Sequence, residues 1–277
     1  MSDELALGRY RLPLGRRTLV MGIVNANPDS FYDRGSHAGT ERASARARAL
    51  IDQGADIIDI GGQTGQCGEE LSVATEIDRI RPVVQELAPL GIPLSVDTYR
   101  AEVADAVLAA GAVLVNDYTG FFDPDLPGVA ARHRAGIVCA HYRGAPRSNP
   151  SRSYAVSVDE VEDVLRARLQ QALDAGVPRE SLLADPCFGF GKSTASDLAL
   201  VAALPRLRTL DAALLAACSH KEFTADATGL AEDDLRGTLA AAVLCAQGGA
   251  DVLRLHDVGE IVPALRLVDA VRAEAEA

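Results

Sequence analysis

The sequence predicts an α/β protein that folds as a single-domain (β/α)8 TIM barrel. Eight short apolar runs recur along the chain with a repeat of about 30 residues, which matches the strand–helix repeat of this fold. The segments between the runs are rich in Ala, Leu, Glu and Arg, as helices are, and several end close to a glycine. Aromatic residues make up 4% of the chain and Trp is absent, so aliphatic side chains must form the core, as in a buried parallel sheet.

The expected elements can be placed in chain order. The apolar runs are continuous rather than alternating, which is typical of strands buried on both faces. The expected strands are Leu19–Asn25, Ala55–Gly62, Pro93–Thr98, Val113–Tyr118, Ile137–Tyr142, Ser181–Pro186, Ala213–Ser219 and Asp251–Val258. The expected helices include Thr40–Gln53, Glu70–Leu87, Arg100–Ala110, Ser157–Ala175 and Asp233–Ala246. Residues 1–18 are interpreted as an N-terminal extension and residues 19–277 as the barrel.

Two other architectures fit the sequence less well. A length of 277 residues would allow two average domains, but barrels of about 250 residues fold as one, and no linker divides this chain. A doubly wound open sheet is the main alternative, but the first strand is not followed by a glycine-rich turn of the GxGxxG type. The eightfold repeat therefore favours the closed barrel.

The overall charge argues against polyanionic partners. The chain has 27 Lys and Arg against 39 Asp and Glu, which gives a net charge of −12 at pH 7. Proteins that bind nucleic acid or anionic membrane surfaces need a basic patch, and no run of clustered Lys and Arg occurs here. We therefore expect neither nucleic acid nor a membrane as a partner.

The sequence predicts a cytoplasmic protein with reduced thiols. The first residues contain no apolar core of the kind that a secretory signal needs, and no uncharged apolar run reaches about 18 residues. The five cysteines show no CxxC spacing, and their odd number excludes a complete disulfide framework.

Polar side chains concentrate where the eight expected strands end, which is where the catalytic residues of a barrel lie. They include Asn25, Asp59, Asp97, Asn116, Asp117, His141, Asp185, Ser219, His220, Lys221, Arg254 and His256. A single buried Asp or Asn can simply satisfy a neighbouring backbone group, but every strand end carries such a residue. Neighbouring Asp and Asn side chains can hold an amino-amide heterocycle, and Lys, Arg and His can hold an anion. We therefore expect a small polar heterocycle beside a phosphate-like group.

Eight stretches around these strand ends also form an ordered set of motifs. They are MGIVNANPDSF (21–31), GADIIDIGG (54–62), SVDTYRAEVADAVLAAGA (95–112), ND (116–117), AHYRG (140–144), DPCFGFGK (185–192), SHKEF (219–223) and RLHDV (254–258). In this order the sequence resembles the dihydropteroate synthase family of the folate pathway. The resemblance implies a TIM barrel, commonly a homodimer, that joins 6-hydroxymethyl-7,8-dihydropterin pyrophosphate to 4-aminobenzoate. Pyrophosphate is released, and Mg2+ is the expected cofactor.

The resemblance assigns roles to individual residues. Asp97, Asn116, Asp185 and Lys221 would bind the pterin, and Asn25, Arg254 and His256 would hold the pyrophosphate. Lys221, Arg254 and His256 would be the catalytic residues, and Asn25 would also reach the metal. Thr64, Gln66 and Ser219 would face the aminobenzoate. The family reaction is dissociative, so no side chain has to act as a covalent nucleophile.

The sequence departs from the family on the aminobenzoate side. Where family members read GGESTRPG in the second loop, residues 61–68 read GGQTGQCG, with Gly65, Gln66 and Cys67 in place of Thr, Arg and Pro. Gln66 supplies neither the charge nor the bidentate fork of arginine. The first loop has Asn27 in place of Thr, and the SRK motif becomes SHK at 219–221.

These departures leave three hypotheses about function. The first is a working dihydropteroate synthase with a reshaped second loop. The second is a divergent paralogue that binds a pterin but makes no dihydropteroate. The third is a pterin-binding methyltransferase domain of the corrinoid type, which ranks lowest because such a domain does not need Lys221 and the Arg254-x-His256 pair.

Overall fold

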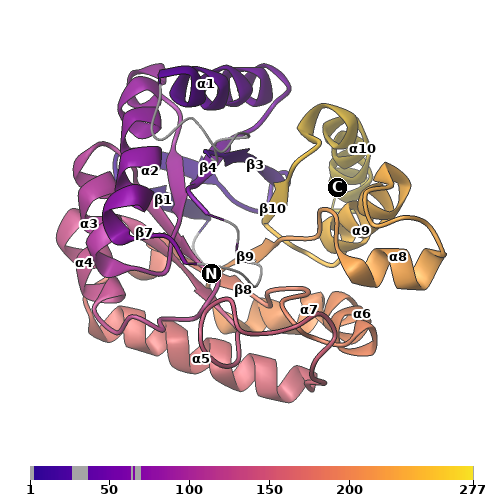
Figure 1. Ribbon diagram of the computed structural model, residues 1–277. Helices are drawn as coiled ribbons and strands as arrows, with labels where there is room; N and C mark the ends of the chain where they lie inside the picture. Colours follow the sequence, from indigo (N-terminus) through magenta and orange to yellow (C-terminus); the bar gives the residue numbers. More distant parts are fainter. Residues whose placement is uncertain (1–2, 27–36, 64, 66–69, 277) are drawn as a thin grey trace.

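Eight parallel strands close into a barrel surrounded by helices in the computed structural model (Figure 1), which describes residues 3–26, 37–63, 65 and 70–276. The strand order around the barrel is β10-β3-β4-β5-β6-β7-β8-β9. The strands are β3 (Leu19–Asn25), β4 (Ile57–Gly61), β5 (Leu94–Asp97), β6 (Leu114–Asp117), β7 (Gly136–Ala140), β8 (Leu182–Asp185), β9 (Ala213–Ala216) and β10 (Val252–Leu255). The predicted (β/α)8 fold is confirmed. Most strands are shorter than the apolar runs that contain them, because the polar residues at their ends turn into the loops.

The helices form the outer layer of the barrel. They are α1 (His37–Asp52), α2 (Val73–Leu87), α3 (Ala101–Ala109), α4 (Leu126–His133), α5 (Val158–Asp174), α6 (Thr194–Ala202), α7 (Leu204–Leu207), α8 (Glu222–Thr228), α9 (Leu235–Gln247) and α10 (Val258–Glu276). Serine hydroxyls fix three of the helix starts: Ser72, Ser157 and Ser193 accept hydrogen bonds from the third backbone N–H of α2, α5 and α6. None of the helices in the described part of the chain has the length and apolar character needed to cross a membrane.

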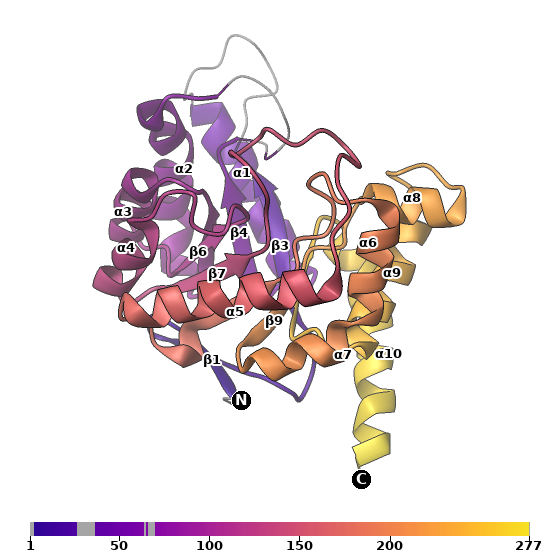
Figure 2. The same ribbon diagram turned by 90° about the horizontal axis from the view of Figure 1, so that it is seen from below.

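A β-hairpin closes the N-terminal end of the barrel. Strands β1 (Glu4–Leu7) and β2 (Tyr10–Pro13) pair antiparallel within the segment that was interpreted as an extension. Leu5 and Leu7 are fully buried in a cluster with residues from the beginnings of the barrel strands, among them Leu19 and Ile57. Figure 2 places β1 at the end of the barrel opposite the long loop that follows β7. The hairpin therefore leaves only the C-terminal end of the barrel open for a site.

Replacing Leu7 by Ala should destabilise the barrel, because it leaves a cavity between the hairpin and the strand beginnings. We expect the free energy of unfolding to fall by about 2–5 kcal/mol in urea denaturation. Leu12→Ala on the hairpin's other strand is the control, since Leu12 is only half-buried. Equal, small losses for both variants would show that the hairpin is not part of the core.

Candidate functional site

Polar side chains from four strands form one hydrogen-bonded network inside the open end of the barrel. Asp59 lies on β4, Asp97 on β5, Asn116 on β6 and Arg254 on β10. Asp59 Oδ2 accepts hydrogen bonds from Asn116 Nδ2 at 3.0 Å and from Arg254 Nε at 2.7 Å. Arg254 Nη2 donates to Asp97 Oδ2 at 2.7 Å. We call these four residues the interior network.

The interior network contains an ion triad of Asp59, Arg254 and Asp97 that is largely removed from water. The side chain of Asp59 is 0% exposed and that of Arg254 is 17% exposed. Burial alone would lower the pKa of Arg254, but the Asp59 and Asp97 carboxylates outweigh burial and raise it. Burial raises the pKa of Asp97 to about 7, although Arg254 opposes the change. The guanidinium therefore stays charged, and Asp97 is poised to gain or lose a proton near neutral pH.

The barrel mouth carries less net positive charge than the sequence predicts. Arg254 lies between two carboxylates, which balance its charge locally. Burial, reinforced by the Arg254 and His220 charges, lowers the pKa of His256 to about 4, so His256 is neutral at pH 7. Its ring Nδ1 lies 3.0 Å from Ser219 Oγ, which accepts a hydrogen bond from the His256 backbone N–H at 3.2 Å. His256 can therefore offer a hydrogen bond to an anion, but not a positive charge.

Asp185 lies beside this network at the end of β8, and Lys221 lies in the loop between β9 and α8. The Asp185 side chain is buried, and its Oδ1 accepts a hydrogen bond from the Cys187 backbone N–H at 2.7 Å. Burial raises the pKa of Asp185, while the Cys187 N–H and the Lys221 charge oppose the change. Lys221 precedes α8, and its Nζ lies 4.6 Å from the centroid of the Phe190 ring, within reach of a cation–π interaction.

Four aromatic side chains line consecutive strand ends next to the polar residues. Tyr99 follows β5, Tyr118 follows β6, Tyr142 follows β7, and Phe190 lies in the loop after β8. Tyr118 stacks on Phe190 with ring centroids 4.7 Å apart, and its edge contacts to Tyr99 and Tyr142 span 6.2 and 5.4 Å. We call this set the aromatic arc. The chain has only six Tyr and six Phe, so four of these twelve at neighbouring strand ends is a signal that the sequence contained and our interpretation missed.

The loops after β4 and β7 meet above the strand ends. Gln63 Oε1, directly after β4, accepts a hydrogen bond from Arg147 Nη1 at 2.6 Å. The end of the same loop is held from the start of α3, because Arg100 donates to the carbonyl of Leu71 at 2.8 Å. Strands β5 and β6 lie between β4 and β7 in the barrel, so the Arg147–Gln63 contact bridges the strands that carry Asp97 and Asn116.

The structure shows why a glycine suits position 65 of the altered second loop. A Cβ atom at this position would lie 2.9 Å from Phe190 Cε1 and 3.4 Å from Tyr118 Cε1. A residue with a side chain, such as the Thr of the family motif, would require the loop or the Phe190 ring to shift. Asn27, Thr64, Gln66 and Cys67, the other altered or assigned loop positions, lie outside the described residues.

A cavity of about 580 Å3 opens next to Lys221. Phe190 and Gly189 border it on one side, Pro150 and Ser151 of the loop after β7 on another, and the beginning of α8 on a third. It can hold a substrate the size of an arylamine next to Lys221.

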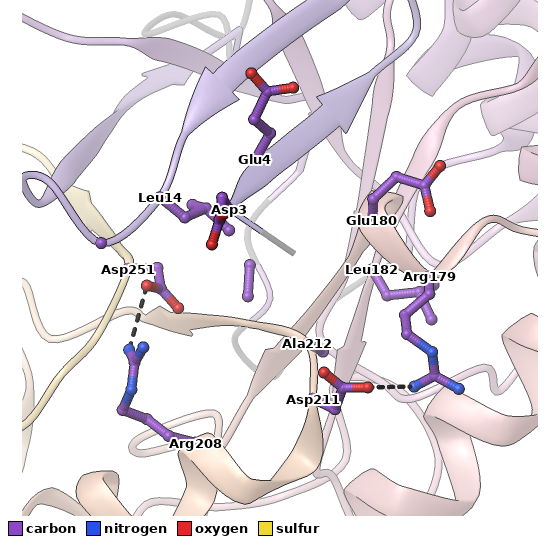
Figure 3. Close-up of a pocket in the computed structure, with 12 residues that line it drawn as sticks. Asp3, Glu4, Leu14, Arg179, Glu180, Leu182, Arg208, Asp211, Ala212 and Asp251 are labelled. Atoms are coloured by element: carbon purple, nitrogen blue, oxygen red, sulfur yellow. Dashed lines mark hydrogen bonds and ion pairs between the residues drawn. The ribbon is translucent and has the colours of Figure 1, made fainter. Parts of the chain in front are cut away.

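A smaller cavity of about 110 Å3 lies at the opposite end of the barrel (Figure 3). Two ion pairs border it there: Arg208 with Asp251 at 3.2 Å and Arg179 with Asp211 at 3.4 Å. It lies beside the β1–β2 hairpin, away from every residue that the sequence assigned to a site.

The structure brings most of the assigned residues together and adds new ones. Asp97, Asn116, Asp185, Ser219, Lys221, Arg254 and His256 all lie at the open end, and Asn25 ends β3 there with an exposed side chain. The sequence interpretation did not assign a role to Asp59, which joins Asn116 to Arg254. Its position in the GADIIDIGG motif was the available signal.

Comparison with known proteins identifies the family. A family model described as pterin binding enzyme matches residues 21–256. The chain belongs to the dihydropteroate synthase family of pterin-binding enzymes. The structure of dihydropteroate synthase from Xanthomonas albilineans with 4-aminobenzoic acid is 39% identical, covers 99% of each chain, and superposes with a TM-score of 0.88.

Two relatives of similar identity carry names that imply opposite activities. A probable bifunctional folylpolyglutamate synthase/dihydropteroate synthase from Halobacterium salinarum is 42% identical over 95% of this chain, which spans only 32% of that relative's length. A protein named inactive dihydropteroate synthase 2, from Mycobacterium tuberculosis, is 41% identical over 93% of this chain and 84% of its own. The chain is about equally identical to a relative named as a probable synthase and to a relative named inactive. Sequence identity alone therefore does not decide its activity.

Removing the Asp59 carboxylate should disrupt the interior network. In Asp59→Ala the Asn116 amide and the Arg254 Nε lose their shared acceptor, so we expect the free energy of unfolding to fall by about 3–5 kcal/mol. Asp105→Ala is the matched control, because Asp105 pairs with Arg132 at the surface and such pairs contribute about 1 kcal/mol or less. Similar unfolding midpoints for the two variants would contradict a buried network that supports the barrel.

Proposed function

We propose that this protein is a transferase of the dihydropteroate synthase type. It would join 6-hydroxymethyl-7,8-dihydropterin pyrophosphate to 4-aminobenzoate and release pyrophosphate. The observation that carries the proposal is a carboxylate oxygen of the interior network that has no hydrogen-bond partner among the described residues. Asp59 Oδ1 is buried and has no hydrogen-bond partner in the described part of the chain. A buried acceptor of this kind calls for a ligand that donates, as the amino and ring N–H groups of a pterin do.

The pterin would lie between the polar side chains of β4, β5, β6 and β8, with one of its donors facing Asp59 Oδ1. Asp97 and Asp185 offer carboxylate oxygens and Asn116 an amide, which together suit a 2-amino-4-oxo edge. Lys221 would contact the ring near the reacting methylene. Asp97, Asn116 and Asp185 lie at strand ends of the closed barrel, so a bound heterocycle meets groups that are already in place.

Bond breaking would precede bond making. The C–O bond between the pterin methylene and the pyrophosphate breaks, and the electron pair leaves on the pyrophosphate oxygen. The amine nitrogen of 4-aminobenzoate, held in the cavity beside Lys221, then bonds to the methylene carbon and releases one proton to solvent. Asn25, Arg254 and His256 would hold the departing pyrophosphate, and Thr64, Gln66 and Ser219 would face the aminobenzoate.

Magnesium fits the donor chemistry at this end of the barrel. Protein sites for Mg2+ often supply one or two oxygens and leave the remaining positions to substrate phosphates and water. The described residues contain no group of three His, Cys, Asp or Glu side chains that could hold a metal, but Asn25 presents an exposed carboxamide at the end of β3. We propose Asn25 as the protein ligand. The bound ion would neutralise negative charge on the departing pyrophosphate.

We further propose that the chain is a cytoplasmic homodimer, as the family resemblance implies. Leu267 and Val271 on α10 are 67% and 61% exposed, and these apolar side chains one helical turn apart would suit a subunit interface.

Purified protein should release pyrophosphate only when the pterin pyrophosphate, 4-aminobenzoate and magnesium are all present. Lys221→Ala should lower kcat by about a hundredfold, since it removes a charge next to the reacting atoms. Arg236→Ala, at an exposed pair with Asp234 on the surface, should leave the rate unchanged. Release no higher than the background rate in the unmodified protein would contradict the proposal.

The second candidate function is a pterin-binding paralogue that does not make dihydropteroate. Two observations favour it: Gln66 stands where the family has arginine, and the Mycobacterium tuberculosis relative is named inactive. Such a protein would use the same interior network and Lys221 but take a different acceptor, or none.

Gln66→Arg separates the two candidates. If the missing guanidinium alone limits the reaction, the variant should raise kcat/KM for 4-aminobenzoate by about tenfold or more, because one charge-assisted hydrogen bond is restored. Growth rescue of a strain without its dihydropteroate synthase provides the second measurement. Robust rescue by the unmodified protein would eliminate the paralogue, whereas no rescue by either form would support it.

A further inference from the structure

Tyr118 occupies the centre of the aromatic arc, two residues after Asn116. Its side chain is 7% exposed. The Phe190 ring lies parallel to it with an interplanar angle of 15°, while Tyr99 and Tyr142 contact it at angles of 84° and 85°. The backbone of Gly65 approaches one edge of the ring. Contacts on several sides hold Tyr118 in one orientation.

The hydroxyl of Tyr118 is buried without a hydrogen-bond partner in the described structure. The other tyrosines of the arc differ in this respect. Tyr99 donates to the carboxylate of Glu70, and Tyr142 donates to the carbonyl of Ala145 at 3.1 Å. Burying a hydroxyl without a partner destabilises a folded protein. In the centre of an otherwise satisfied set, such a group is available to hydrogen-bond a ligand.

Tyr118 follows the strand that carries Asn116, and the charge of Asp97 acts on its hydroxyl. Burial is the main reason why the pKa of Tyr118 is raised, and the nearby Asp97 carboxylate adds to the effect. The phenol therefore keeps its proton at neutral pH and can act as a donor. Asp97 and Asn116 belong to the interior network, so Tyr118 adjoins the residues that we assigned to the heterocycle.

We propose that Tyr118 is a substrate-binding residue whose hydroxyl donates a hydrogen bond to the bound heterocycle. This inference rests on the proposed function, because the ligand class is the pterin held by Asp97, Asn116 and Asp185. Those carboxylates accept from the amino side of the ring. A hydroxyl donor complements them by meeting an acceptor, which is either the ring carbonyl or a ring nitrogen. Tyr118 thus selects for heterocycles that carry both donors and an acceptor.

The buried hydroxyl of Tyr118 also affects the stability of the protein. A buried hydroxyl that gains its partner only when a ligand binds destabilises the free protein and favours the bound one. Deleting it should therefore stabilise the protein and weaken ligand binding together. A tyrosine that served only packing would not show both effects.

Tyr118→Phe tests this inference, with Tyr154→Phe as the matched control. Tyr154 also has a buried hydroxyl without a partner in the described residues, but its ring packs near Arg143 and Lys192, neither of which belongs to the interior network. Affinity is measured by calorimetry with 6-hydroxymethylpterin, and stability by urea unfolding. We expect Tyr118→Phe to weaken binding about tenfold and raise the unfolding midpoint. Tyr154→Phe should raise the midpoint and leave the affinity unchanged.

The outcomes separate the inference from the proposed function. If the unmodified protein binds 6-hydroxymethylpterin and Tyr118→Phe binds it equally well, the role of Tyr118 is refuted while the pterin site stands. If both variants lose affinity to the same extent, the effect is not specific to Tyr118, and the inference is likewise overturned. If the unmodified protein binds no pterin, the proposed function fails, and the inference fails with it.

Discussion

The guanidinium of Arg254 lies between the carboxylates of Asp59 and Asp97, and the arrangement of the open end depends on this buried ion triad. Removing three charges from water is unfavourable, and the triad is stable only while each partner is present and hydrogen-bonded. Asn116 donates a hydrogen bond to one carboxylate oxygen of Asp59 and thereby joins a fourth strand to the network. Four strand ends are held in fixed relation by contacts that no local segment could make.

This rigidity has a direct chemical use. A transferase that relies on a dissociative step needs groups that hold the reacting fragment while the leaving group departs, rather than a nucleophile of its own. The interior network provides fixed acceptors, and Lys221 lies beside it between Phe190 and the adjoining cavity. Since His256 is neutral and Arg254 is balanced by carboxylates, Lys221 is the main source of positive charge among the assigned residues that the structure describes. That makes the lost arginine at position 66 more consequential than the net charge of −12 alone indicates.

The altered second loop packs against the aromatic arc. Gly65 allows the loop backbone to approach Phe190 and Tyr118 more closely than a residue with a Cβ atom would. Gln63, in the same loop, contacts Arg147 from the loop after β7. These two described residues of the altered second loop therefore contact segments that follow β6, β7 and β8.

The sequence by itself determined the fold and most of the site. Eight continuous apolar runs each became a buried strand, because a closed parallel sheet requires apolar residues on both faces. Polar residues at their ends had to converge, since parallel strands of a barrel end on the same side. Motif order identified the family, and the described residues that it assigned, from Asn25 to His256, all lie at that end.

Only the tertiary structure decided which of these residues bind one another. Asp59 and Arg254 are 195 positions apart, and no local pattern indicates that they form an ion pair. The neutrality of His256 depends on burial and on the nearby Arg254 charge. The hairpin of residues 4–13 has too short an apolar pattern to reveal that it closes the barrel. The unsatisfied hydroxyl of Tyr118 likewise follows from the packing of four strand ends around it, because hydrogen bonding and charge are set by contacts between segments distant in the chain.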